Sequence, residues 1–134
     1  MNKEVTGTED MELGGFLIKS STDAAQAISN LPPESVISYF EELRPQNALE
    51  TMLIGQMASA HAHCIEMFKQ ASQDSYYEAQ LERLKMAQRL MKTFASCLET
   101  LEKTRRKGSQ NVKVEHVHVN SGGQAIVGNV DRGG

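Results

Sequence analysis

The feature that most constrains the fold of this chain is an apolar repeat that continues through residues 47–103. In its first half, Leu49, Leu53 and Met57 follow one another at spacings of four. Further apolar residues continue the run at spacings of three and four as far as Ala71. Such spacing places side chains on one face of an α-helix, so the run predicts a long amphipathic helix.

After a polar break at residues 72–75, the second half of the repeat carries two adjacent apolar stripes. One stripe consists of Tyr77, Leu81, Leu84, Met91, Ala95 and Leu98, and the other of Met86, Leu90, Phe94, Cys97 and Leu101. An apolar face this wide covers more than one neighbour. We therefore expect an antiparallel hairpin of helices 47–72 and 75–107, with one side covered by N-terminal helices and the other available to a partner subunit.

Local signals place the ends of the helices. Asn47 with Glu50, and Ser75 with Glu78, have the spacing of capping boxes. Pro33 favours the first turn of a helix over residues 33–43. Residues 1–20 are predicted to be a disordered or loosely attached arm, because little in them can be buried. Residues 21–107 then form a helical domain, which begins with short helices.

Residues 108–134 break with this pattern and predict a C-terminal β tail. The run of residues 112–119 is rich in β-branched side chains, Asn120 to Gly123 supply a turn, and residues 124–130 form a second run. A two-stranded hairpin is marginally stable alone, so the tail is expected to pair between copies of the chain. The predicted oligomerisation residues are Val112, Val114, Val117, Val119, Ile126 and Val127.

Charge is distributed unevenly along the chain. Residues 1–50 carry three basic and nine acidic side chains, whereas residues 51–134 carry eleven basic and eight acidic ones. The candidate nucleic-acid-binding residues are Lys103, Arg105, Arg106, Lys107 and Lys113. Clustered cations can neutralise several phosphates, especially when several subunits combine them. The alternative is that they stabilise a helix C-terminus and keep the chain soluble.

Histidines and cysteines supply the only candidate metal ligands of the nitrogen and sulfur type. His116 and His118 share one face of the predicted strand, but one chain then offers two nitrogens, too few for a closed zinc site. A metal would need histidines from neighbouring copies. His61 and Cys64 lie three residues apart on a predicted helix, where a structural role is favoured. Cys64 and Cys97 lie on apolar stripes and are expected to be buried free thiols.

Catalytic motifs are missing from the sequence. It contains no Gly-x-Ser-x-Gly, no phosphate-binding glycine loop and no His-Glu-x-x-His. We therefore expect a protein that is not an enzyme and holds no cofactor. The first ten residues are polar and no apolar run reaches the ~20 residues of a membrane helix, which predicts a cytoplasmic protein without a membrane partner.

The tail is similar to that of a group of small uncharacterised bacterial proteins found in prophages and other mobile elements. The similarity lies in Val114-Glu-His-Val-His-Val119 and Gly122-Gly-Gln-Ala-Ile-Val-Gly128, and in the helical segment Leu90 to Ala95. It extends from Pro45 to Val130. The layout of a helical hairpin followed by short strands also resembles phage terminase small subunits, which form rings. The acidic N-terminal part departs from them, because it has no basic recognition helix.

Together these observations predict a mainly α, homo-oligomeric assembly protein associated with a phage or mobile element. DNA binding in the manner of a terminase small subunit is one form that this function can take. One alternative is an adaptor that binds a larger protein partner and no nucleic acid. A further alternative is an oligomer that binds metal through the tail histidines.

Overall fold

The computed structural model describes residues 2–121, with side chains as far as residue 107. These residues form the helices α1 (Lys3–Thr6), α2 (Met11–Gln26), α3 (Pro33–Leu43), α4 (Ala48–Gln73) and α5 (Tyr77–Ser121). None of the described residues lies in a β-strand. The chain divides into two units, Met1–Glu99 and Thr100–Gly134.

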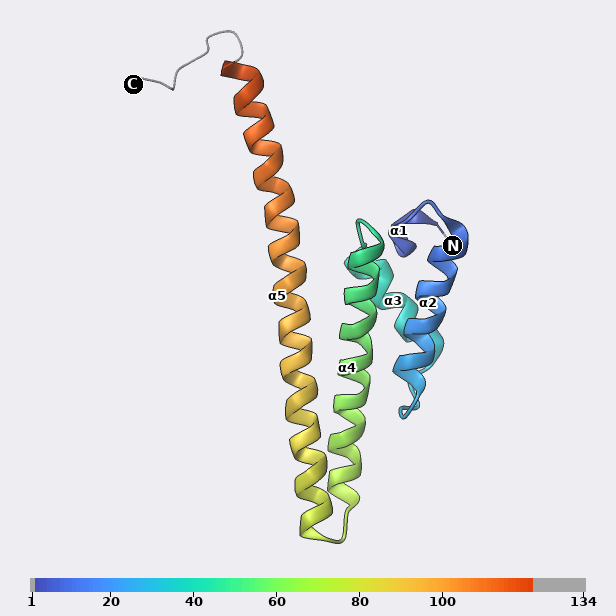
Figure 1. The fold of residues 1–134 in the computed structure, drawn as a ribbon. Coiled ribbons are helices and arrows are strands. Elements are labelled where there is room, and N and C mark those ends of the chain that lie inside the picture. The colour runs from blue at the N-terminus through green and yellow to red at the C-terminus, as the bar shows by residue number, and fades with distance from the viewer. Residues whose placement is uncertain (1, 122–134) are drawn as a thin grey trace, which may run out of the picture. The chain divides into compact units, whose positions relative to one another are not determined.

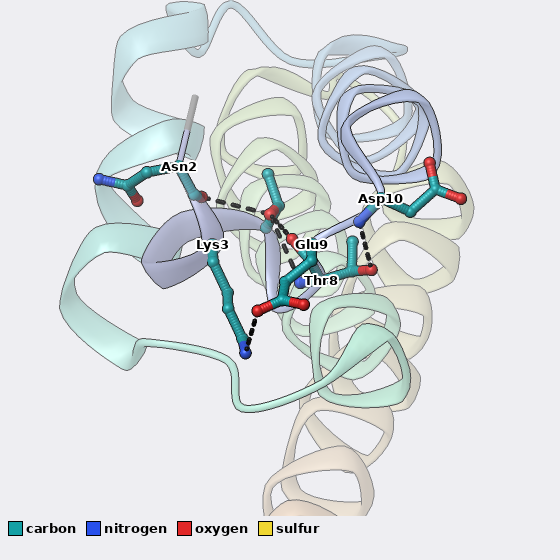
Figure 2. A network of polar contacts seen from close by, with 6 residues as sticks. Asn2, Lys3, Thr8, Glu9 and Asp10 are labelled. Atoms are coloured by element: carbon teal, nitrogen blue, oxygen red, sulfur yellow. Dashed lines mark hydrogen bonds and ion pairs between the residues drawn. The ribbon is translucent and has the colours of Figure 1, made fainter.

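The N-terminal turn is held by short polar contacts, which Figure 2 shows. The Thr6 hydroxyl donates to the carbonyl of Thr8 at 2.9 Å, and Lys3 forms an ion pair with Glu9 at 3.1 Å. Gly7 has a φ of 69°, and a Cβ there would lie 2.6 Å from the carbonyl oxygen of Asn47. The turn therefore packs against the start of α4, as the buried 2.7 Å hydrogen bond from Thr51 Oγ1 to the Thr6 carbonyl confirms.

Helix α2 begins at a side-chain cap. The carboxylate of Asp10 accepts hydrogen bonds from the backbone N–H groups of Glu12 and Leu13, both at 3.0 Å. Leu17 and Ile18 on this helix are buried. The first twenty residues thus contain α1 and part of α2, where the sequence predicted a disordered or loosely attached arm. These residues are mostly polar, but a few apolar side chains lie at helical spacing among them. Those few are sufficient to hold the helix in place because α4 covers them.

Helix α3 spans the residues that the sequence predicted, with Pro33 in its first turn. Its Val36 and Phe40 side chains are fully buried. The helix ends at Arg44, which has a left-handed φ of 45° and donates its N–H to the Phe40 carbonyl at 2.9 Å. A proline follows, so the chain turns into α4.

Helix α4 packs against α2 on one side and against α5 on the other (Figure 1). Its N-terminus has the predicted cap: Asn47 Oδ1 accepts from the Glu50 N–H at 3.0 Å, and Glu50 Oε2 accepts from the Gln46 N–H at 2.9 Å. Gly55 faces Ser21 of α2 so closely that a Cβ would overlap the serine hydroxyl. A residue without a Cβ at this position of α4 therefore lets α2 approach.

The antiparallel hairpin of α4 and the first part of α5 is confirmed (Figure 1). Polar contacts fix the turn between the two helices. Arg83 binds Asp74 at 2.8 Å and also donates to Gln70, while the Gln80 amide donates to the Ala71 carbonyl at 3.0 Å. A carbonyl at the end of α4 is thereby satisfied by a side chain of α5.

The predicted β tail is not found in the described residues. Helix α5 continues past Gly108 to Ser121, so residues 112–119 are helical. β-branched residues adopt strands when a neighbouring strand and packing support them, whereas a helix satisfies its own backbone. Continuing through one glycine costs only about 1 kcal/mol. Residues 122–134, which contain the second predicted strand, lie outside the described part of the chain.

Candidate functional site on the helical hairpin

The inner stripe of α5 consists of Ala87, Leu90, Phe94 and Cys97 and packs on α4. Ala87 is fully buried in a cluster with Cys64 and Met67, against which Leu90 packs. Further along, the thiol of Cys97 donates to Gln56 Oε1 at 3.6 Å. These residues repeat at spacings of three and four, the heptad pattern by which two helices interlock.

The outer stripe of α5 runs beside it and is exposed to solvent. It consists of the residues Tyr77, Leu81, Leu84, Met91, Ala95 and Leu98. Its five large side chains have exposed fractions from 36% (Leu81 and Leu84) to 71% (Tyr77). Gln88 is the polar member of the same heptad row. Exposed apolar side chains that lie together in one row mark an interaction site far more often than scattered ones do.

An apolar groove lies next to the outer stripe in the same unit, between α3, α4 and α5. Its volume is about 310 Å³, and its lining residues include Tyr39, His61, Phe94 and Leu98. The His61 ring lies edge-on to Tyr39 at a centroid distance of 6.4 Å and 6.3 Å from the Phe94 ring. Leu98 belongs both to this α3–α4–α5 groove and to the outer stripe, so the two form one apolar surface.

The sequence predicted two apolar stripes but not which of them packs on α4. The N-terminal helices cover α4, and α5 contributes its inner stripe to the hairpin. Met86, which the sequence grouped with the buried stripe, is 42% exposed. It sits about 100° away from Ala87 on the helix and therefore outside the contact with α4.

The predicted basic cluster lies on α5 in the second unit. Lys103, Arg106 and Lys107 are exposed and occupy positions i, i+3 and i+4, which share one face of the helix. Arg105 is half-buried and lies off this face. The side chain of Lys113, the fifth predicted residue, is outside the described part. The structure thus brings together three of the five predicted cations.

The predicted tail sites lie in the last part of α5 and beyond it, where no side chains are described. His116 and His118 lie in helical backbone, where positions two apart are separated by about 200° and do not share a face. The metal prediction depended on the two histidines lying on one face of a β-strand. Val112, Val114, Val117 and Val119 are also in α5, without described side chains, and Ile126 and Val127 lie outside the described residues. Within the described part, no three metal-binding side chains of His, Cys, Asp or Glu cluster.

The cysteines are buried free thiols, as predicted. Burial raises the pKa of the Cys64 thiol, which donates to the Ala87 carbonyl at 3.7 Å. A neutral, buried thiol is a poor nucleophile and a poor metal ligand, so its role is structural.

Among the described helices, none is both long enough and apolar enough to cross a membrane.

Comparison with protein-family models, with curated proteins and with solved structures finds no match to this chain. The resemblance of the tail to proteins of mobile elements therefore stays a prediction.

Proposed function

We propose that this chain is a non-enzymatic assembly protein that pairs with a second copy of itself through the outer stripe of α5. The observation that carries the proposal is a row of exposed apolar side chains at heptad spacing, interrupted at Gln88, on a helix whose inner stripe already packs on α4. Heptad rows are the pattern by which helices recognise other helices. The same helix in a second copy offers a matching row, and a two-fold pair would bury both.

Charges beside the outer stripe support an antiparallel pair. Glu78 and Lys92 are exposed and each lies seven residues from Lys85. In an antiparallel pair centred near Lys85, Glu78 of each copy therefore faces Lys92 of the other. Lys85 itself is neutralised within its own helix by Glu82 at 3.2 Å. Opposite charges beside an apolar seam favour one orientation over the other.

The test is the molar mass in solution. Burying each half-exposed leucine or methionine contributes roughly 0.5–1.5 kcal/mol, so two residues are changed together. Wild-type protein should have the mass of an oligomer in light scattering, and Leu84→Glu with Met91→Glu should have the mass of a monomer. Met86→Glu with Ile65→Glu is the matched control, because it also adds two negative charges at exposed apolar sites, both outside the stripe.

A monomeric wild type would overturn the proposal, as would an equal loss of mass in the control with Met86→Glu and Ile65→Glu. A truncated variant, lacking residues 111–134, separates the outer stripe from the tail. Pairing through the stripe predicts that this truncated chain stays oligomeric. A truncated chain that is monomeric would instead assign the pairing to the tail.

A second candidate function is binding of a polyanion such as DNA. The observation that favours it is the helix face formed by Lys103, Arg106 and Lys107. Residues 103–114, which include this face, contain no acidic residue. DNA binding should weaken steeply as salt increases, with a logarithmic slope of about −0.9 per neutralised phosphate. Changing these three residues to Glu should abolish it.

The matched control changes Lys69, Lys85 and Lys92 to Glu, which alters the net charge equally and leaves the basic face intact. Equal loss in both triple variants would show a non-specific effect of charge. Wild-type protein that does not bind DNA at low salt would reject this second function and leave an assembly protein that recognises only proteins.

A further inference from the structure

The outer stripe of α5 begins at a tyrosine that is largely exposed. Tyr77 is the first residue of α5, directly after the turn that joins α4 to α5 (Figure 1). It is 71% exposed, the highest value among the five large residues of the stripe. Tyrosine offers a large, rigid ring and is one of the residues that most often anchor an interface between proteins. Pairing through the outer stripe must therefore give this ring a place on the second copy.

The α3–α4–α5 groove lies at the opposite end of the stripe, where Leu98 lines it. Its volume is about 310 Å³, and three aromatic rings already line it. The His61 ring lies 6.4 Å from the Tyr39 ring, edge-on, and 6.3 Å from the Phe94 ring. Ala95, the one small residue of the stripe, comes directly after Phe94. A groove lined by rings, beside a small residue, offers a hole into which an aromatic side chain of a second copy can pack.

The antiparallel register brings these two ends of the stripe together. The proposed pair places Glu78 opposite Lys92, so Tyr77, one residue before Glu78, lies opposite the turn of α5 that follows Lys92. Tyr77 and Leu98 occupy one of the two heptad positions of the stripe, and Ala95 occupies the other. In an antiparallel seam, side chains at one of these positions face side chains at the other. The residue that faces Tyr77 is therefore Ala95.

Two-fold symmetry sets the side of the seam on which the tyrosine lies. Tyr77 of the second copy and Leu98 of the first share a heptad position, so both lie along the same edge of the seam. Leu98 borders the α3–α4–α5 groove along that edge. The charged residues Glu78 and Lys92 share a different heptad position and lie along the other edge. The ring of Tyr77 therefore reaches the first copy beside the mouth of the groove.

We infer that Tyr77 of each copy inserts its ring into the α3–α4–α5 groove of the other, between Phe94 and Leu98. The inference rests on the proposed pairing and names the residue that anchors it. The inserted ring extends the aromatic cluster of the groove, and a two-fold pair makes the contact twice. An apolar row alone can pair with many helices, whereas a groove formed by three helices accepts the ring in one register only. The groove therefore selects a second copy of this chain over other helices with heptad rows.

The direct test is a measurement of contacts between copies. Isotope-labelled and unlabelled full chains are mixed, and filtered nuclear Overhauser spectra then record only contacts from one copy to the other. We expect contacts from the ring protons of Tyr77 to the methyl groups of Leu98 and to the ring of Phe94. A paired protein in which Tyr77 contacts Tyr77 or Leu81 of the other copy, or no groove residue, would overturn the inference and leave the pairing standing. A monomeric protein would overturn both.

Variants at the two exposed tyrosines test how much the ring contributes. Tyr77→Ala should raise the dissociation constant of the pair at least about tenfold, as the loss of a buried interface anchor does. Tyr77→Phe keeps the ring and should stay within about twofold of the wild type. The matched control is Tyr76→Ala, at a neighbouring residue that is 75% exposed and outside the stripe, and it should also stay within about twofold. Equal weakening by the two alanine variants in sedimentation experiments would contradict the inference.

A variant of the groove separates insertion of the ring from contact with the stripe alone. Tyr39 lines the groove from α3 and is not part of the stripe. Tyr77→Ala should weaken pairing at least about twofold less in Tyr39→Ala protein than in the wild type, because residues in contact do not contribute additively. In Ile28→Ala protein, changed at an exposed apolar residue outside the groove, Tyr77→Ala should keep its full effect. An undiminished effect in folded Tyr39→Ala protein would show that Tyr77 stays outside the groove.

Discussion

The inner and outer stripes of α5 have similar residue spacing and apolar character, but one is largely buried and the other is exposed. Both are apolar rows at spacings of three and four on the same helix, displaced from each other by about one residue. The inner stripe contains the fully buried Ala87, whereas the outer stripe keeps Tyr77 71% exposed. The comparison teaches that helical periodicity shows which residues share a face, while burial depends on which neighbour reaches that face.

The largest expected difference between the two stripes is the change in the free energy of unfolding when a charge is placed in each. Ala87→Glu should lower the free energy of unfolding by at least about 3 kcal/mol, because the charge has no room and no partner in the contact with α4. Gln88→Glu, one position further on the exposed row, should change it by less than about 0.5 kcal/mol. Urea unfolding at a concentration where the chain is monomeric measures both. Similar losses would contradict the assignment of the two stripes.

Thiol reactivity sharpens the comparison without disturbing the fold. Cys64 and Cys97 are buried, so alkylation by iodoacetamide requires the hairpin to open. The raised pKa of Cys64, which burial causes, slows its reaction further. A cysteine placed in the outer stripe by Met91→Cys should react at least about a hundredfold faster than either native thiol in the monomer. Mass spectrometry after timed quenching measures the rates, and equal rates would show that the inner stripe is not protected.

Truncation of one large side chain in each stripe should give a smaller difference. Phe94→Ala removes a ring that packs near His61, and we expect a loss of about 2 kcal/mol because Phe94 is half-buried. Met91→Ala should cost less than about 1 kcal/mol in the monomer and should instead weaken self-association. Thermal unfolding at low concentration and light scattering at high concentration separate the two effects. The comparison fails if Met91→Ala destabilises the monomer as much as Phe94→Ala.

The smallest expected effect concerns the charges beside the outer stripe. Exposed ion pairs contribute about 0.2–1 kcal/mol each, so Glu78→Lys should weaken the proposed pair only a few-fold. Adding Lys92→Glu should restore the affinity, because the swapped charges again face each other. Sedimentation at low salt measures the dissociation constants. If the double variant is weaker than the single one, the copies do not pair in the antiparallel arrangement.

Much of the hairpin could be predicted from the sequence because its signals are local. Asn47 and Glu50 mark the start of α4, and the polar residues 72–75 mark its end. The N-terminal arm was harder to predict. Asp10 is a good helix cap and Leu17 and Ile18 follow at helical spacing, but the surrounding residues are polar and the covering partner, α4, is distant in sequence.

The candidate sites were predictable to different degrees, for physical reasons. The basic face needed only helical spacing once α5 was known to be a helix. The tail prediction depended on β-propensity, which takes effect only when a partner strand is present, and residues 112–119 are helical in this structure. A groove of about 490 Å³ between α2, α4 and α5 gave no signal in the sequence, because its lining residues, such as Ser20, Ser59 and Leu90, come together only when these helices pack.

The sequence by itself determined the helices of the hairpin, the cap of α4 and the two apolar stripes, since these depend on contacts within a few residues. Only the tertiary structure decided that the inner stripe faces α4, that residues 3–26 pack on the body, and that the outer stripe is left exposed. The reason is that an apolar row is buried by whichever complementary surface reaches it. Which row is buried therefore depends on how all the helices of the first unit pack together.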